Sequence, residues 1–187
     1  MQIFNLKQNK HSVVRLLSKK GFSLLELLIY LAILSVLVVV IANIFISLSK
    51  SNAQSQAKSE VNSAIRFASE LLRQDIKSSS VISVPTTPGG TTSPTLTLTR
   101  DGVVIIWDTS AGVLRRKEGS ANPINVTNAN VLVGTPVFTR IENANQTFGT
   151  TNVSIGINIT FSYNSASPDS TYSDSLQTTI NSYNAYQ

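Results

Sequence analysis

Few residues in this sequence have side chains suited to catalytic chemistry. The chain contains no cysteine, which excludes disulfides, thiolate metal sites and cysteine nucleophiles. Its only histidine is His11, so no serine–histidine–carboxylate arrangement is available in the rest of the chain. Gly89-Gly90 lacks the lysine and the strand context of a phosphate-binding loop. We therefore predict that the protein is not an enzyme and has no cofactor or metal centre.

Oxygen ligands for a cation gather in one late segment. Ser167, Asp169 and Asp174 offer the hydroxyl and carboxylate oxygens that calcium prefers. The same composition is typical of a polar turn, which is the interpretation we favour. The acidic residues beyond the first predicted hairpin are too dispersed to indicate a metal site: Glu118, Glu142, Asp169 and Asp174.

One carboxylate, Glu26, stands at the start of a long apolar run. Residues 27–42 carry no charge, and the apolar segment is long enough to cross a bilayer, which takes about 20 residues. A carboxylate deep in a bilayer costs on the order of a few kcal/mol, and less near the edge. In a helix that begins near Phe22, Glu26 lies only about 6 Å along the axis, at the cytoplasmic boundary. Among packed apolar helices it would need a positive partner; alternatively, it simply extends into the lipid headgroups.

Positive charge is concentrated before the apolar run. No acidic residue precedes Glu26, and ten basic and ten acidic residues remain after Gly21, so the side-chain charge there sums to zero. Positive charge before an apolar segment holds that end in the cytoplasm, so we expect the C-terminal part to be exported. We do not expect nucleic acid to be a partner, because the basic excess belongs to these first residues: Lys7, Lys10, Arg15, Lys19 and Lys20.

The order of these features differs from that of a secretory signal peptide. In a signal peptide the small-residue cleavage site follows the apolar region. Here the small residue, Gly21, precedes it, and nothing like Ala-x-Ala follows it. We therefore expect the apolar helix to remain in the mature protein.

Residues 19–28 read Lys-Lys-Gly-Phe-Ser-Leu-Leu-Glu-Leu-Leu. This stretch resembles the prepilin peptidase site of the type IV pilin superfamily. The resemblance implies that the peptidase recognises Lys19 and Lys20, cleaves between Gly21 and Phe22, and that Phe22 is then N-methylated. It also implies that Glu26 serves assembly by pairing with the free amine of Phe22, its own or that of a neighbouring subunit.

A helix that begins near Phe22 meets no breaker before Pro85, because that part of the chain contains neither proline nor glycine. We predict a leader over residues 1–21, a membrane and filament-core helix over 22–48, and an amphipathic stem helix over 49–84. An apolar stripe in the stem predicts that this face of the helix packs against a sheet; the alternative is that it forms a coiled coil. Its members are Ala57, Val61, Ala64, Ile65, Ala68, Leu71, Leu72 and Ile76.

The rest of the chain is predicted to be a loop over residues 85–94 and a β-sheet head domain over 95–187. Asp101-Gly102 between two β-rich runs is a strong hairpin signal, and Ser110–Gly112 indicates a second turn. The fold class is therefore α+β, a long N-terminal helix packed on a C-terminal antiparallel sheet, as in pilins. Candidate strands are residues 95–100, 103–108, 113–117, 131–133, 137–142, 153–163 and 171–183.

Several departures from major pilins favour a minor subunit. Major pilins often have a proline midway through the membrane helix and a C-terminal cysteine pair, and this chain has neither. Residues 70–76 resemble the stem end of J-type pseudopilins, whereas K-type tip subunits usually lack the glutamate present here as Glu26. The resemblance thus implies a minor subunit of a type IV pilus or type II secretion-like pseudopilus that helps to initiate or prime filament assembly.

The implied partners are other pilin or pseudopilin subunits, the prepilin peptidase, the inner-membrane assembly platform and, before assembly, the lipid bilayer. The implied location is the inner membrane, crossed once, and then the pilus. One alternative is a signal-anchored envelope protein for binding or adhesion that never polymerises. Another is a DNA-uptake pseudopilin, but at most two residues of the basic cluster Arg115–Lys117 share one face of a strand. Motility, secretion and DNA uptake all use the same helix.

Overall fold

The computed structural model describes residues 23–86, 92–145 and 150–182. The chain divides into two compact units, Met1–Phe45 and Ile46–Gln187, and one long helix belongs to both. The elements are α1 Leu24–Ser78, β1 Val81–Val84, β2 Thr92–Ser93, β3 Leu96–Arg100, β4 Val103–Ser110, β5 Val113–Glu118, β6 Ile124–Asn125, β7 Val131–Val133, β8 Val137–Asn145, β9 Thr150–Tyr163, the 3₁₀ turn η1 Pro168–Ser170 and β10 Ser173–Asn181.

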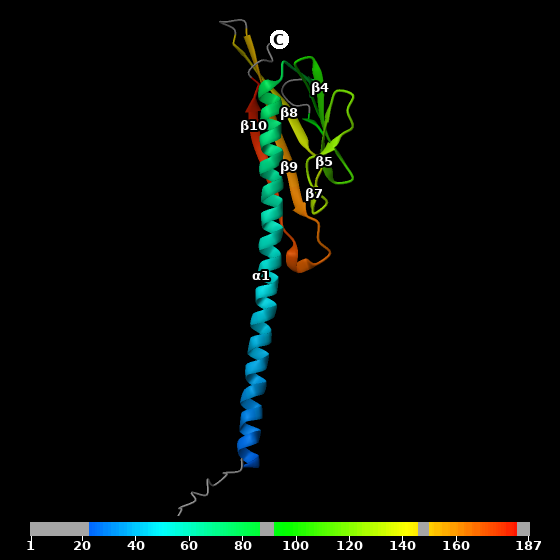
Figure 1. The fold of residues 1–187 in the computed structure, drawn as a ribbon. Coiled ribbons are helices and arrows are strands. Elements are labelled where there is room, and N and C mark those ends of the chain that lie inside the picture. Colours follow the sequence, from blue (N-terminus) through cyan, green and yellow to red (C-terminus); the bar gives the residue numbers. More distant parts are fainter. Residues whose placement is uncertain (1–22, 87–91, 146–149, 183–187) are drawn as a thin grey trace, which may run out of the picture. The chain divides into compact units, whose positions relative to one another are not determined.

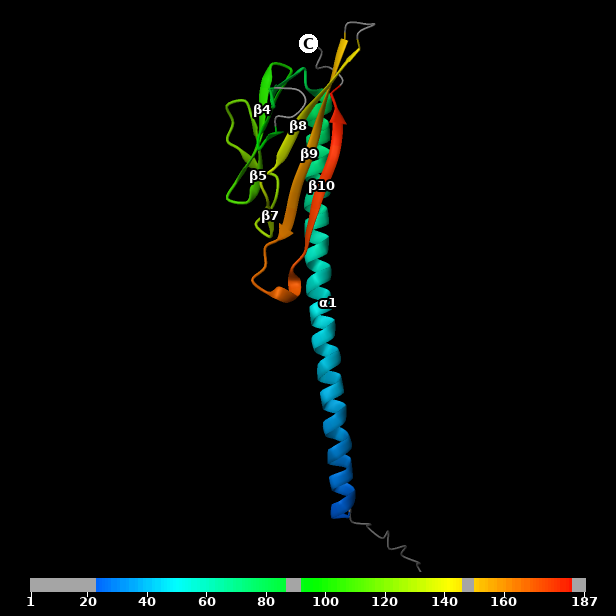
Figure 2. The ribbon, with the colours of Figure 1, turned by 180° about the vertical axis from the view of Figure 1, so that it is seen from behind.

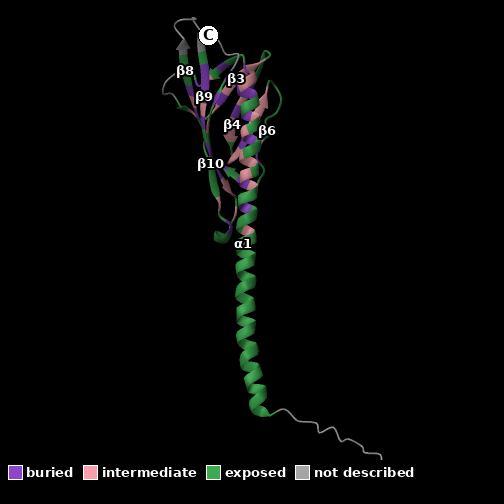
Figure 3. Cartoon of the chain, turned by 90° about the vertical axis from the view of Figure 1, so that its left-hand side faces the viewer, coloured by how far each residue is buried: buried purple, intermediate pink, exposed green. Residues whose placement is uncertain are grey.

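The first unit, where it is described, is the apolar start of α1. Its large hydrophobic side chains are exposed, from 49% for Val40 to 80% for Leu24. Figure 3 colours this segment as exposed throughout. The segment includes a window with a mean hydropathy of 3.0, long enough to cross a membrane. This part of α1 therefore has the length and surface of a membrane-anchoring helix.

The C-terminal end of α1 differs from the sequence prediction. The stem helix was expected to reach residue 84, but α1 ends at Ser78 and residues 81–84 form β1. The hydroxyls of Ser78 and Ser79 donate to the carbonyls of Gln74 and Ile76, each at 2.7 Å, which offers the backbone an alternative to further helix. The β-branched residues that follow then pair with β3.

The second unit holds two antiparallel sheets, where the sequence suggested one. The first has the strand order β1-β3-β4-β5-β6. The second has the order β10-β9-β8-β2, and β7 pairs with the end of β9 that lies beyond β8. Figures 1 and 2 show α1 running beside β9 and β10 from two sides. The predicted α+β class, a long helix on antiparallel strands, is confirmed.

The predicted hairpin at Asp101-Gly102 is confirmed. Both residues have positive φ, 52° and 80°, as the right-handed twist of the paired strands β3 and β4 favours. The second turn, at Ala111-Gly112, has the same character, with φ values of 51° and 74°. Three short strands, β1, β2 and β6, were not among the candidate strands predicted from the sequence.

One hydrophobic core joins the stem part of α1 to both sheets. Val61, Ala68, Leu72 and Ile76 enter it from the predicted stripe, and Ala57 of the same stripe is also buried. The remaining stripe residues are partly buried against the core: Ala64, Ile65 and Leu71. Trp107 of β4 is fully buried, as its position among β-branched residues suggested. The stripe is thus the face of α1 against which the sheets pack.

Candidate processing and assembly site

Glu26 lies in the first turn of α1. The carbonyl of Ser23 accepts a hydrogen bond from the amide of Leu27 at 3.1 Å, so the helix is already closed around this turn. The positive end of the helix dipole favours a carboxylate at such a position. The side chain also accepts a hydrogen bond from Tyr30 Oη at 3.2 Å, because residues four apart share a helix face. The acid thus has a donor within its own helix.

The surface that follows Glu26 is apolar on every side. Its leucine, isoleucine and valine side chains are exposed in a continuous series, and soluble monomers rarely leave such an apolar surface uncovered. Such a surface requires lipid or other apolar helices around it. The described part of this helix holds no second charge before Lys50.

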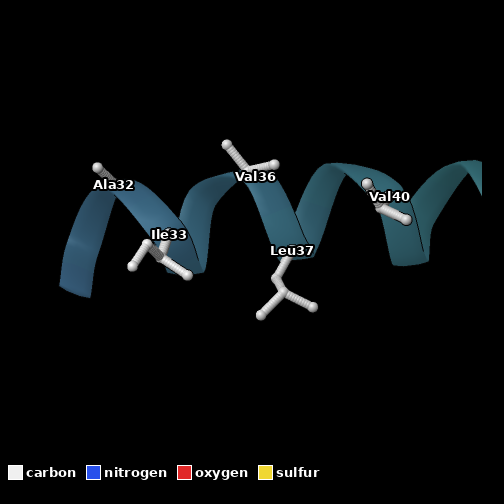
Figure 4. Close-up of a pocket in the computed structure, with 5 residues that line it drawn as sticks. All are labelled: Ala32, Ile33, Val36, Leu37 and Val40. Carbon is white, nitrogen blue, oxygen red and sulfur yellow. The ribbon is translucent and has the colours of Figure 1, made fainter. Parts of the chain in front are cut away.

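A shallow groove runs along this surface between two rows of side chains (Figure 4). Ala32, Val36 and Val40 form one row at a spacing of four residues, and Ile33 and Leu37 form the other. The five side chains are aliphatic, so the groove offers no polar group to a substrate or cofactor. Rows at this spacing are the ridges through which helices interlock. The groove is therefore suited to another apolar helix.

Four of the predicted site residues, Lys19, Lys20, Gly21 and Phe22, lie outside the described residues. Their roles stay predictions from the sequence. Glu26 is the one predicted site residue whose surroundings the structure describes, and it places that carboxylate where the helix begins.

Residues 16–42 match the model of the prokaryotic N-terminal methylation motif. The match spans Lys19 and Lys20, the glycine junction, Glu26 and most of the apolar run. This chain carries the methylation motif of a type IV pilin-like prepilin. No curated protein and no solved structure matched it. With the long helix on antiparallel sheets, the motif indicates a pilin-like protein of type IV pilus or type II secretion systems, a kind that is typically structural and non-enzymatic.

A second charged group, in the head of this pilin-like chain, was missed from the sequence. Asp75 is not one of the apolar stripe residues, yet it is only 2% exposed. It accepts hydrogen bonds from Arg116 Nε at 2.7 Å, Arg100 Nη1 at 3.1 Å and Trp107 Nε1 at 3.0 Å. We call Asp75, Arg100, Arg116 and Glu118 the buried-face ion cluster.

Glu118 closes this cluster from the solvent side. It accepts from Arg116 Nη1 at 2.7 Å and from Arg100 Nη2 at 3.0 Å, so two positive and two negative charges balance. The hydrogen bond and the charge of Arg116, with a smaller effect of Arg100, hold the pKa of Glu118 below its ordinary value of 4.5. The hydrogen bond that Arg116 donates to Asp75 outweighs burial and raises the pKa of this guanidinium.

A sequence signal for this cluster existed. Arg100 follows the inward residues Leu96 and Leu98 at a spacing of two, and Arg116 follows Leu114 in the same way. Both arginines therefore lie on the same strand face as the buried leucines, where a charge is stabilised by a partner of opposite sign. The cluster also uses one of the residues considered for DNA, and Arg115 pairs with Asp108 at 2.8 Å, so these two charges serve ion pairs within the fold.

The segment considered for calcium is a turn between β9 and β10. Ser167 caps η1 by accepting from the amide of Asp169, and Asp169 pairs with Lys50 at 3.2 Å. Asp174 instead accepts from the amide of Ser175 at 2.7 Å. No group of three or more histidine, aspartate or glutamate side chains suited to a metal occurs in the described part of the chain.

Proposed function

We propose that the chain is a minor structural subunit of a type IV pilus or a type II secretion-like pseudopilus and helps to initiate filament assembly. The observation that carries the proposal is the position of Glu26. It is the only acid among residues 22–48, the apolar segment that carries the methylation motif, and it lies in the first turn of α1.

The first step of the proposed function is processing. The prepilin peptidase recognises Lys19 and Lys20, removes residues 1–21, and the new N-terminal Phe22 is methylated. Gly21, without a side chain, permits close approach of the peptidase to the bond beside it. Removal of the leader takes away five of the fifteen basic residues. The mature side chains are then balanced at ten positive and ten negative.

The second step is the transfer of residues 22–48 from lipid into the filament core. In the membrane, Glu26 waits near the cytoplasmic edge, where its hydrogen bond from Tyr30 offsets part of its desolvation. In the filament, the amine of Phe22 from the same or a neighbouring subunit neutralises the carboxylate. The groove between the rows at Ala32 and Ile33 accepts the neighbouring helix.

The subunit is proposed to be a minor one of the J type. The support comes from the sequence: no proline interrupts the apolar helix, no cysteine closes a C-terminal loop, and Glu26 is retained. Such a subunit joins other pilins on the inner-membrane assembly platform early in filament growth.

The test replaces Glu26 by glutamine and compares it with Glu70→Gln, which alters an exposed acid of the same helix. Both variants and the parent are expressed with the filament machinery, with and without the peptidase. We expect mass spectrometry to show loss of residues 1–21 and a methylated Phe22 in all three when the peptidase is present. Incorporation of Glu26→Gln into sheared filaments should fall about tenfold or more, because a desolvated amine loses its partner.

An intact N-terminus on the exported chain would overturn the processing step and favour a signal-anchored protein. Equal incorporation of Glu26→Gln and the parent would overturn the role of Glu26 in assembly.

A further inference from the structure

A polar groove of about 500 Å³ lies where the apolar run of α1 ends. Ser47, Lys50, Ser51 and Gln54 line one side, at helix spacings of three and four residues that place them on one face. Pro168, Asp169 and Thr171, in and after η1, line the other side. Figures 1 and 2 both show this turn, between β9 and β10, beside α1.

The two charges of the groove face each other. Lys50 Nζ and Asp169 Oδ1 are 3.2 Å apart, and their side chains are 55% and 48% exposed. An exposed pair of this kind contributes little to stability, so each partner exchanges readily for a ligand of opposite charge. Hydroxyl and amide groups around the pair can donate and accept further hydrogen bonds. The groove is thus complementary to a small group that carries both charges.

The position of Lys50 along the helix indicates at which level of the membrane such a group would be found. Lys50 is the first charged residue after Glu26. Twenty-four residues separate the two, and a helix of that length rises about 36 Å at 1.5 Å per residue, whereas the hydrocarbon core of a bilayer is about 30 Å thick. With Glu26 at the cytoplasmic boundary, Lys50 lies at the headgroup level of the opposite leaflet.

We propose that this groove binds the headgroup of a phospholipid with a primary amine, in the outer leaflet of the inner membrane, before the subunit assembles. Lys50 pairs with the lipid phosphate and Asp169 with its ammonium group. A quaternary ammonium has no N–H to donate to Asp169, and a glycerol headgroup has no positive charge to pair with it. The inference rests on the membrane stage of the proposed function.

The test is native mass spectrometry of the processed full-length chain, taken from detergent that contains equal amounts of phosphatidylethanolamine, phosphatidylcholine and phosphatidylglycerol. We expect the chain to retain phosphatidylethanolamine about fivefold over either other lipid. Lys50→Gln should lose retention of all three lipids. Asp169→Asn should abolish the preference and shift retention toward phosphatidylglycerol. Lys58→Gln, an exposed lysine outside the groove on the same helix, is the matched control and should behave as the parent.

Retained lipid with the composition of the mixture, or variants at Lys50 and Asp169 that match the parent, would overturn the site. Displacement of the lipid by soluble phosphoethanolamine at the same concentration would overturn a lipid ligand. The same spectra give the polypeptide mass, so failure of leader removal, which contradicts the proposed function, is distinguished from failure of lipid selection.

Discussion

Asp75 illustrates how a buried charge is tolerated at the scale of one residue. It is withdrawn from water, but two guanidinium groups and an indole N–H donate to its oxygens. A buried ion pair adds little net stability compared with an apolar replacement, yet removal of one partner leaves the other charges uncompensated. Glu26, by contrast, is exposed in the structure and has a tyrosine donor and a place at the helix end.

Asp75→Ala is expected to destabilise the head by about 3 kcal/mol, because Arg100 and Arg116 then face each other with only Glu118 between them. Urea unfolding of the full chain, followed through the fluorescence of its single tryptophan, Trp107, measures this. Asp174→Ala, at an exposed acid, is the control and should change the free energy of unfolding by less than about 0.5 kcal/mol. Equal effects of the two variants would contradict the role of the cluster.

The lowered pKa of Glu118 predicts that the fold loses part of its stability in acid. Its pKa in the folded chain is lowered below 4.5, so its ionised form stabilises the fold above that pH. This stabilisation is lost as the pH falls through the folded pKa. We expect Glu118→Gln to be less stable than the parent at neutral pH and the gap to close well below pH 4.5. Unfolding at a series of pH values measures the gap, and a gap independent of pH would contradict the prediction.

At the scale of elements, α1 has two surfaces with different partners. Its stem buries a stripe against both sheets, while its apolar start buries nothing within the described chain. The stem is therefore held by tertiary packing, and the start requires lipid or other helices. The serines at its C-terminal end, rather than a proline, set the length of the helix.

Leu72→Ala is expected to cost about 2–5 kcal/mol in the free energy of unfolding, because this fully buried side chain leaves a cavity between α1 and the sheets. Phe67→Ala, five residues earlier on the same helix, removes a side chain that is 55% exposed and should cost much less. Chemical unfolding of the full-length variants gives both values. A larger loss from Phe67→Ala would contradict the assignment of the buried face.

At the scale of the whole molecule, the hydrophobic core lies entirely within the second unit. The earliest residue of the connected core is Val61, well after the apolar run. The described part of the first unit exposes apolar side chains suited to lipid or other apolar helices, whereas the second unit buries a core of its own.

A fragment of residues 50–187 is therefore expected to be soluble and folded. It keeps every residue of the described core, and the described side chains that it lacks, residues 23–49, are exposed, so its free energy of unfolding should match that of the full chain in detergent within about 1 kcal/mol. Size-exclusion chromatography and urea unfolding check this. A fragment that aggregates or has no cooperative transition would show that the head depends on the apolar helix.

Local signals determined much of this protein from its sequence. The apolar run and the absence of helix breakers indicate the long helix, the stripe at helical spacing indicates its buried face, and Asp101-Gly102 indicates a hairpin. These features depend on neighbours in the chain. The methylation motif is also local, which is why the position of Glu26 could be recognised from sequence alone.

Only the tertiary structure decided which distant charges meet. Asp75 and Arg116 are 41 residues apart, and Lys50 and Asp169 come from opposite ends of the head sequence. The division into two sheets, and the pairing of β1 with β3 in place of more helix, likewise depend on long-range strand contacts. Periodicity shows which way a side chain points within its element, but the partner it meets is set by how the elements pack.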